Sequence, residues 1–280
     1  MWALFLNAIN RFRGQVLGWG ISLGILALYL LTFYDTLVEQ QAQLQQLFAS
    51  YPPELWAFFG DIGEMFSPEG YLTIEFFSYM PLILGIYAIL AGSGLLAGDE
   101  ENGTMDLVLA HPISRTRLFF GRLLAFLAAT IVILGLSWVG LVLGLNFTTL
   151  ELSWQELALP FISLGVVLLV FGAFAILMSV VLPSRRAAAM AGGLAVVGSF
   201  FLTSLARVDE NLEAAARFSP LNYYQGGDAI LGLNLEWNGG LAAVALLMVL
   251  LAWWRFERRD IRVGGEGSWG LPRLRRRAVT

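Results

Sequence analysis

Residues 157–182 read LALPFISLGVVLLVFGAFAILMSVVL, a stretch without a single Asp, Glu, Arg, Lys or His. A helix needs about 20 apolar residues to cross the hydrocarbon core of a bilayer. Five further stretches are equally free of charge and long enough to cross: residues 16–34, 76–97, 123–145, 187–206 and 239–254. The sequence therefore predicts an all-α polytopic membrane protein with six transmembrane helices.

The composition supports this fold class and excludes several kinds of chemistry. Of the 280 residues, 58% are hydrophobic and 14% are charged, whereas about 25% are charged in a typical soluble domain. The chain has no cysteine and one histidine, so metal clusters of these ligands and cysteine nucleophiles are not expected. All 17 basic residues are arginines, and a Walker A phosphate loop cannot be written without lysine.

The arginines are distributed unevenly between the connections. All of them except Arg207 and Arg217 precede the first span, separate spans two and three or four and five, or follow the sixth. The positive-inside rule then places both termini in the cytoplasm. Residues 35–73, 146–156 and 207–238 are the predicted outer loops.

The segments beside the spans suggest further features. Residues 1–15 combine apolar and polar positions and are expected to form an N-terminal interfacial helix, and residues 263–280 form a basic cytoplasmic tail. Arg122, near the start of the third span, is expected to extend its guanidinium to the inner interface. Small-residue spacings could mark a dimer face or packing within one subunit, and 30 glycines favour the second. The spacings are Gly14/Gly18, Gly20/Gly24, Gly94/Gly98 and Gly140/Gly144.

The connection between spans two and three is the most informative hydrophilic segment. Residues 98–117 read GDEENGTMDLVLAHPISRTR. Asn102 or Thr104 can cap a short helix, acids suit the start of that helix, and Pro112 ends it. Ser114 can then cap the helix that continues into span three. From these residues alone, the segment is either a coupling helix that transmits a push from a cytoplasmic partner or a plain connecting loop.

This segment resembles the signature loop of ABC-2 type permeases, in which an acidic pair, Gly-Thr, a short apolar helix and Pro-x-Ser-Arg precede the third span. The matching residues are Glu100, Glu101, Gly103, Thr104, Leu107, Leu109, Pro112, Ser114 and Arg115. Residues 218–224 (FSPLNYY) and 256–261 (FERRDI) are similar to the segments before and after the last span of that family. Two departures are the short outer loop 35–73 and Arg122, where the family usually has a lysine.

The resemblance implies that residues 16–262 form the permease domain of an ATP-driven exporter in the inner membrane of a prokaryotic cell. The matching residues of loop 98–117 would then contact a separate ABC ATPase, which binds ATP and Mg²⁺. This chain would itself have no catalytic residue, metal or cofactor. Its other partners would be a second permease copy, identical or not, and membrane lipid, with no nucleic acid. The apolar spans suit a hydrophobic or amphipathic cargo, as in multidrug export.

Two other functions compete with this interpretation. A secondary transporter or channel usually has ionisable groups inside its spans, and these six spans have none. A membrane scaffold or enzyme without a transport role has no positive feature in the sequence. An ATPase that copurifies with the chain would separate the exporter from both alternatives.

Overall fold

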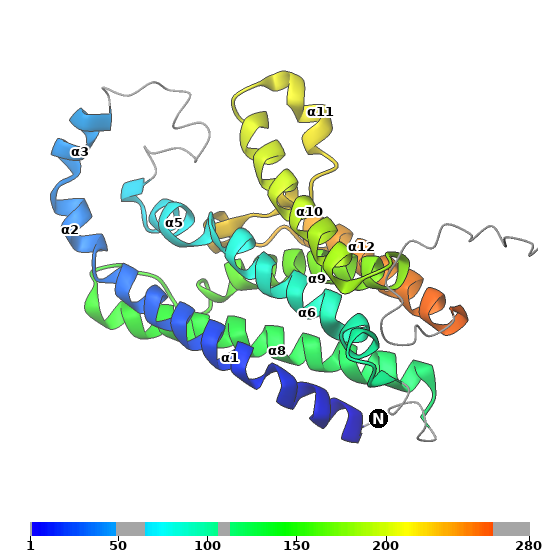
Figure 1. Cartoon of the computed structure of the whole chain (residues 1–280). Helices are drawn as coiled ribbons and strands as arrows, with labels where there is room; N and C mark the ends of the chain where they lie inside the picture. The colour runs from blue at the N-terminus through cyan, green and yellow to red at the C-terminus, as the bar shows by residue number, and fades with distance from the viewer. Residues whose placement is uncertain (1, 49–64, 106–112, 260–280) are drawn as a thin grey trace, which may run out of the picture.

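The computed structural model describes residues 2–48, 65–105 and 113–259, and Figure 1 shows them as a bundle of long helices. Within these ranges, six helices are long and apolar enough to cross a membrane. The six are α1 (Trp2–Leu31), α6 (Met80–Glu101), α8 (Arg115–Gly144), α9 (Ala158–Val181), α10 (Arg185–Ala206) and α12 (Leu235–Arg258). The predicted all-α fold with six membrane-spanning helices is confirmed.

The N-terminal segment is helical from Trp2, but it is not a separate helix. α1 runs without a break to Leu31, so residue 15 marks no helix boundary. Trp2 is 70% exposed and stacks on Phe5 with 5.4 Å between the ring centroids. An exposed tryptophan at the end of an apolar helix suits the headgroup region of a bilayer. The location of residues 1–15 on the inner leaflet stays a prediction.

Glycines bring the backbones of α1 and α8 into contact. The two helices lie side by side in Figure 1. A Cβ atom added to Gly140 of α8 would lie 2.1 Å from the carbonyl oxygen of Gly24 in α1. Gly20 and Gly144 face leucine side chains of the opposite helix, at 2.6 and 2.7 Å from the position of an added Cβ. The glycine pairs Gly20/Gly24 and Gly140/Gly144 therefore serve packing within one subunit.

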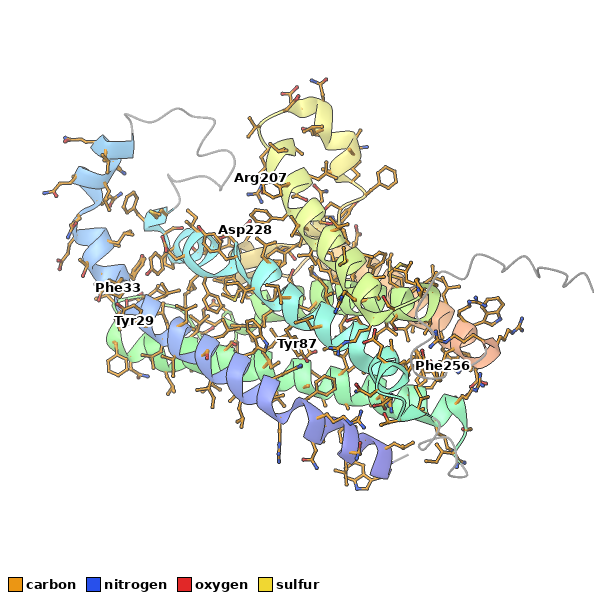
Figure 2. The ribbon with its side chains drawn as sticks, in the orientation of Figure 1. Tyr29, Phe33, Tyr87, Arg207, Asp228 and Phe256 are labelled. Carbon is orange, nitrogen blue, oxygen red and sulfur yellow. The ribbon has the colours of Figure 1, made fainter. Side chains whose placement is uncertain are left out.

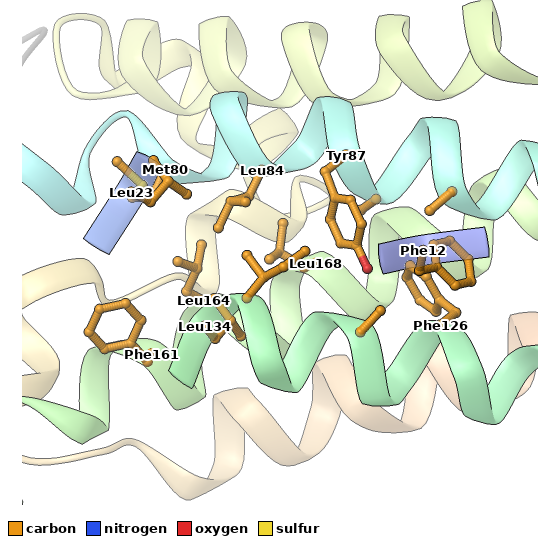
Figure 3. Close-up of a cluster of buried hydrophobic side chains, with 14 of the residues drawn as sticks. Phe12, Leu23, Met80, Leu84, Tyr87, Phe126, Leu134, Phe161, Leu164 and Leu168 are labelled. Atoms are coloured by element: carbon orange, nitrogen blue, oxygen red, sulfur yellow. The ribbon is translucent and has the colours of Figure 1, made fainter. Parts of the chain in front are cut away.

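A second close contact joins α6 to α9, and the core lies between these helices and α8. A Cβ atom added to Gly92 of α6 would lie 2.6 Å from the carbonyl oxygen of Gly172 in α9. The Tyr87 hydroxyl lies 3.1 Å from the hydroxyl of Thr130, and the Tyr87 ring stacks on Phe126. Figure 3 shows Tyr87 and Phe126 among the buried leucines and phenylalanines of this core. α10 packs against both α6 and α9, and α12 packs against α9.

Short helices and turns connect the outer ends of the spans. Tyr71 donates to the carbonyl oxygen of Leu30 at 2.6 Å, and Tyr224 donates to that of Phe77 at 3.0 Å. Burial raises the pKa of Tyr224 well above its ordinary value, so its hydroxyl keeps the proton that it donates. The elements are α2 (Tyr34–Glu39), α3 (Gln41–Phe48), α5 (Pro68–Leu72), the π-helix η2 (Thr73–Phe77), η3 (Leu145–Phe147), η4 (Glu210–Leu212), α11 (Glu213–Ala216), η5 (Pro220–Tyr223) and η6 (Gly226–Leu231).

Contacts between these connections place the predicted outer loops at one end of the bundle. The Asp35 carboxylate accepts a hydrogen bond from the Thr149 backbone N–H at 3.0 Å, which joins the first outer loop to the second. The Thr73 hydroxyl donates to Oδ1 of Asp228 at 3.3 Å, which joins the first loop to the third. In Figure 2, Arg207 and Asp228 lie far from Phe256, which is near the opposite end of the molecule.

Adding one methyl group at the α1–α8 contact should destabilise the protein. In Gly140→Ala, the new Cβ fits only if the two helices separate, and overpacking of this kind costs about 1–3 kcal/mol. The matched control is Gly135→Ala in the same helix, where an added Cβ meets nothing within 4 Å. That control should leave the free energy of unfolding unchanged or raise it. Thermal unfolding in detergent is the measurement, and equal Tm values for the two variants would contradict the contact.

Candidate functional site

The last turn of α6 contains three consecutive acidic residues, Asp99, Glu100 and Glu101, which we call the α6 carboxylate cluster. The C-terminal end of a helix has partial negative charge, so carboxylates are unfavourable there unless cations compensate them. Asp99 and Glu100 are each only 4% exposed, which makes a compensating partner still more necessary. The sequence predicts that these acids precede a short helix, which lies outside the described residues, and the structure places all three at the end of α6.

Asp99 joins α6 to α1 and α8. Its Oδ1 accepts from Nη1 of Arg11 at 2.7 Å, and its Oδ2 pairs with Nη2 of Arg122. Arg122 also donates through Nη1 to the carbonyl oxygen of Leu95 at 2.8 Å. The expectation that Arg122 extends to the interface is therefore wrong. Its side chain is 9% exposed and turns into the bundle, because a buried carboxylate faces it there.

Glu100 joins α6 to the end of α12. Its Oε1 pairs with Nη2 of Arg259, the residue that follows α12, and both side chains are buried. Nη1 of Arg259 also donates to the carbonyl oxygen of Val180 in α9, at 3.4 Å. Removing one partner of a buried ion pair leaves an uncompensated charge, which costs about 3–5 kcal/mol. This pair therefore fixes where α12 ends relative to α6 and α9.

Glu101 joins α6 to the start of α10. Its Oε1 accepts from the backbone N–H of Arg185, the first residue of α10, at 2.8 Å. A carboxylate at this position compensates the partial positive charge of a helix N-terminus. Ser184 completes the cap, because its hydroxyl accepts from the backbone N–H of Ala187 at 3.1 Å. Unlike Asp99 and Glu100, Glu101 is exposed.

The chain leaves α6 through a tight turn at Gly103. The N–H of Gly103 bonds to the carbonyl oxygen of Glu100 at 3.2 Å, and that of Thr104 bonds to Asp99 at 2.9 Å. This pattern is a Schellman motif, which needs a residue with positive φ just past the helix, and Gly103 has a φ of 66°. The Thr104 hydroxyl lies 3.2 Å from Oδ1 of Asp99, so the turn is also tied to the cluster.

Ser114 and Arg115 lie where the connection enters α8. Ser114 caps α8, because its hydroxyl accepts from the backbone N–H of Arg117 at 3.3 Å. Nη1 of Arg115 donates to the carbonyl oxygen of Arg259 at 2.6 Å and to that of Phe256 at 3.3 Å. The guanidinium thus satisfies backbone acceptors at the C-terminus of α12, where a cation is favoured. Leu107, Leu109, Pro112 and the predicted coupling helix lie outside the described residues.

The α6 carboxylate cluster connects helices rather than holding a ligand. Its three carboxylates reach different neighbours, and the described part of the chain has no group of three His, Cys, Asp or Glu side chains placed to hold a metal ion. Through these contacts, the end of α6 is fixed to α1, α8, α10 and α12.

Reasoning from sequence alone missed the partners of the cluster. Glu100, Glu101, Gly103 and Thr104 were identified as a group, whereas Asp99 was not selected, nor was its pairing with Arg11 and Arg122 foreseen. The only signal was the concentration of arginines near the cytoplasmic ends of the spans, and it does not say which arginine meets which acid. Three-dimensional packing decides that choice.

Six apolar helices and a charged junction at one end of the bundle define a multi-pass membrane protein in which the ends of the spans are bonded to one another. The family model of ABC-2 family transporter proteins matches residues 7–261, so the chain belongs to this family and is a membrane component of an ABC transporter. It is also similar to an uncharacterized membrane protein of Bacillus subtilis (strain 168), YdbK. The two are 20% identical over 206 residues, which cover 68% of this chain and 84% of that protein. No solved structure gives a significant match.

The pairing of Glu100 with Arg259 can be tested by removing its partners singly and together. Glu100→Leu and Arg259→Leu should each lower the free energy of unfolding by about 3–5 kcal/mol, because each leaves one buried charge alone. The double variant should lose much less than the sum, since it buries no unpaired charge. The control is Arg255→Leu, which changes an exposed arginine of α12. Additive losses in thermal or denaturant unfolding would show that the two residues do not interact.

Proposed function

We propose that the chain is the permease subunit of an ATP-driven exporter in a prokaryotic inner membrane, with both termini in the cytoplasm. In this proposal a separate ABC ATPase docks on the segment 98–117. The observation that supports it most directly is the α6 carboxylate cluster. It lies at the start of this segment and is bonded to α1, α8, α10 and to the residue that follows α12.

Both ends of the segment are attached to the bundle. At its start, the turn at Gly103 and Thr104 is held by Asp99. At its end, Ser114 caps α8 and Arg115 is bonded to the end of α12. A push on the loop from the cytoplasm would therefore reach several spans at once. An arrangement of this kind suits a subunit that receives mechanical work from a partner.

The structure also divides the acidic pair of the family signature into two roles in this proposal. Glu100 is buried and has its ion-pair partner, Arg259, within the chain. Glu101 is exposed, and its hydrogen bond to Arg185 occupies one carboxylate oxygen. Glu101 is therefore the member of the pair that is available to a basic group on an ATPase, while Glu100 transmits the displacement inward.

The remaining parts of the proposal rest on the family and on composition. ATP and Mg²⁺ would be bound by the partner, since this chain has no lysine for a Walker A motif. A second permease copy, identical or not, would complete the transporter, and the cargo would cross between the two copies. The apolar surfaces of the spans support a hydrophobic or amphipathic cargo. Copurification of the chain with an ATPase from its native membrane is the direct test.

Reversing the charge at Glu101 should weaken the contact between the permease and its ATPase. In Glu101→Arg, transport and substrate-stimulated ATP hydrolysis should fall, with insertion and abundance unchanged. A desolvated charge pair across an interface can cost about 2–5 kcal/mol to disrupt.

The control for this variant is Glu101→Gln, whose amide oxygen can still accept from the N–H of Arg185. If charge is what matters, Glu101→Gln should lose part of the coupling while its Tm stays that of the wild type. Normal transport by an intact Glu101→Arg complex would refute docking at this residue.

The orientation of the chain can be tested with single cysteines, because the natural sequence has none. Phe218→Cys, at a site that is 90% exposed in the third outer loop, should react in intact cells with an impermeant thiol reagent. Arg186→Cys, exposed at the start of α10, should react only after the membrane is opened. The reverse labelling pattern would invert the proposed topology.

A further inference from the structure

A cavity of about 790 Å³ lies between the cytoplasmic halves of α1, α6 and α8. Its size is within the range of about 300–1,000 Å³ that is typical of small-molecule sites. We call it the arginine cavity, because its polar lining includes Arg11, Arg117, Arg122 and Arg185, together with Asp99 and Gln15. The helices that form it belong to separate packing units, since α1 packs along α8, whereas α6 packs along α9 and α10.

The lining of the arginine cavity is strongly positive. Among the described residues that line it, four guanidinium groups face one carboxylate, Asp99, which leaves three positive charges in excess. Arg11 and Arg122 share Asp99, whereas Arg117 and Arg185 form no ion pair within the described ranges. Asp99 is thus already compensated, and a bound anion would meet the two unpaired guanidiniums. An anion with several oxygen acceptors, such as a phosphate group, fits this surface.

Two glycines of α6 give the cavity its depth. The Arg185 guanidinium lies against Gly94, at 3.1 Å from the position that a Cβ atom would take there. A Cβ atom at Gly98 would meet nothing within 4 Å. The spacing Gly94/Gly98, which the sequence left open between a dimer face and internal packing, lines this cavity instead.

An unpaired acceptor marks a second feature of the expected ligand. Oε1 of Gln15 is buried and has no hydrogen-bond partner among the described residues. Leaving a buried acceptor unsatisfied costs about 1–3 kcal/mol. Gln15 lines the cavity, so a ligand with a hydroxyl group near its phosphate would supply the missing donor once the amide turns toward it.

The apolar part of the lining distinguishes a lipid from a soluble phosphate compound. Leu4, Phe12, Leu90 and Leu95 line the same cavity, and Leu90 is 44% exposed. The cavity lies at the cytoplasmic ends of the spans, the level of the headgroups of the inner leaflet. Arginines at this level attract anionic lipids. A soluble anion would use the guanidiniums but would leave these apolar groups exposed to water.

We propose that the arginine cavity binds the headgroup of one anionic phospholipid that has a free hydroxyl, as phosphatidylglycerol does. Arg117 and Arg185 hold the phosphate, Gln15 accepts from the headgroup hydroxyl, and the acyl chains lie against Leu90. The bound lipid bridges the α1–α8 pair and α6. This proposal requires neither an ATPase nor transport, so it can fail or succeed independently of the proposed function.

The test uses the full chain, purified in a neutral detergent and stripped of lipid. Thermal unfolding is followed while micelles are supplemented with phosphatidylglycerol, with phosphatidylcholine or with glycerol 3-phosphate in solution. Phosphatidylglycerol should raise the Tm in a saturable way, and native mass spectrometry should show one bound molecule. The other two additions should leave the Tm unchanged. An equal rise with phosphatidylcholine, or with glycerol 3-phosphate, would overturn the lipid assignment.

Variants decide whether the effect arises in the arginine cavity. Arg117→Gln and Arg185→Gln should each weaken binding by about ten- to hundredfold, as expected when one charged hydrogen-bonding group is lost. Arg13→Gln, an exposed arginine of α1 outside the cavity, should bind as the wild type does.

Gly98→Leu should abolish the rise in Tm that phosphatidylglycerol causes, because the leucine side chain fills the cavity. This variant leaves every charge in place. Its Tm without lipid reports on folding independently of binding. Wild-type affinity in the two glutamine variants, or in a folded Gly98→Leu protein, would overturn the proposal.

Discussion

The constraint on which one end of the helix bundle depends is the presence of three acidic residues in the last turn of α6. Neighbouring carboxylates repel each other, the helix end disfavours them, and two of the three are buried. They are tolerated because other helices supply guanidiniums or N–H groups at fixed positions. Asp99 bonds to both α1 and α8, Glu100 to the residue that follows α12, and Glu101 to the start of α10. The guanidinium suits this role, since it stays charged when buried and offers donors in a fixed planar geometry.

Away from the cytoplasmic ends, the helices are held together differently. α1 meets α8, and α6 meets α9, through glycines that bring backbones within contact distance. In a bilayer, such close approach replaces the hydrophobic effect as the source of helix association. Tyr71 and Tyr224 then tie the outer connections to the spans through buried hydroxyl groups. The bundle is thus held by packing along its length and by ion pairs at the end that carries the α6 carboxylate cluster.

The number and position of the spans could be predicted from the sequence, because absence of charge over a membrane thickness is a local property. Neighbour relations could not be predicted, because they depend on contacts between residues far apart in the chain. Arg122 illustrates the limit. An arginine near a span end ordinarily extends to the interface, and only the buried Asp99 opposite reverses that preference. Likewise, the acids before Gly103 suit either the start of a short helix or the end of a long one. The Schellman turn at Gly103 shows that they end α6.

The packing of α1 against α8 has a consequence for how the protein is made. The chain is synthesised from its N-terminus, so α1, which ends at Leu31, enters the bilayer long before α8 is complete at Gly144. During that interval lipid must occupy the face of Gly20 and Gly24. Of the ion pairs described for the α6 carboxylate cluster, only Arg11 with Asp99 has both members in the chain before α8 emerges. The first two spans are therefore expected to be held together at the membrane surface by that one pair until the third span displaces the lipid.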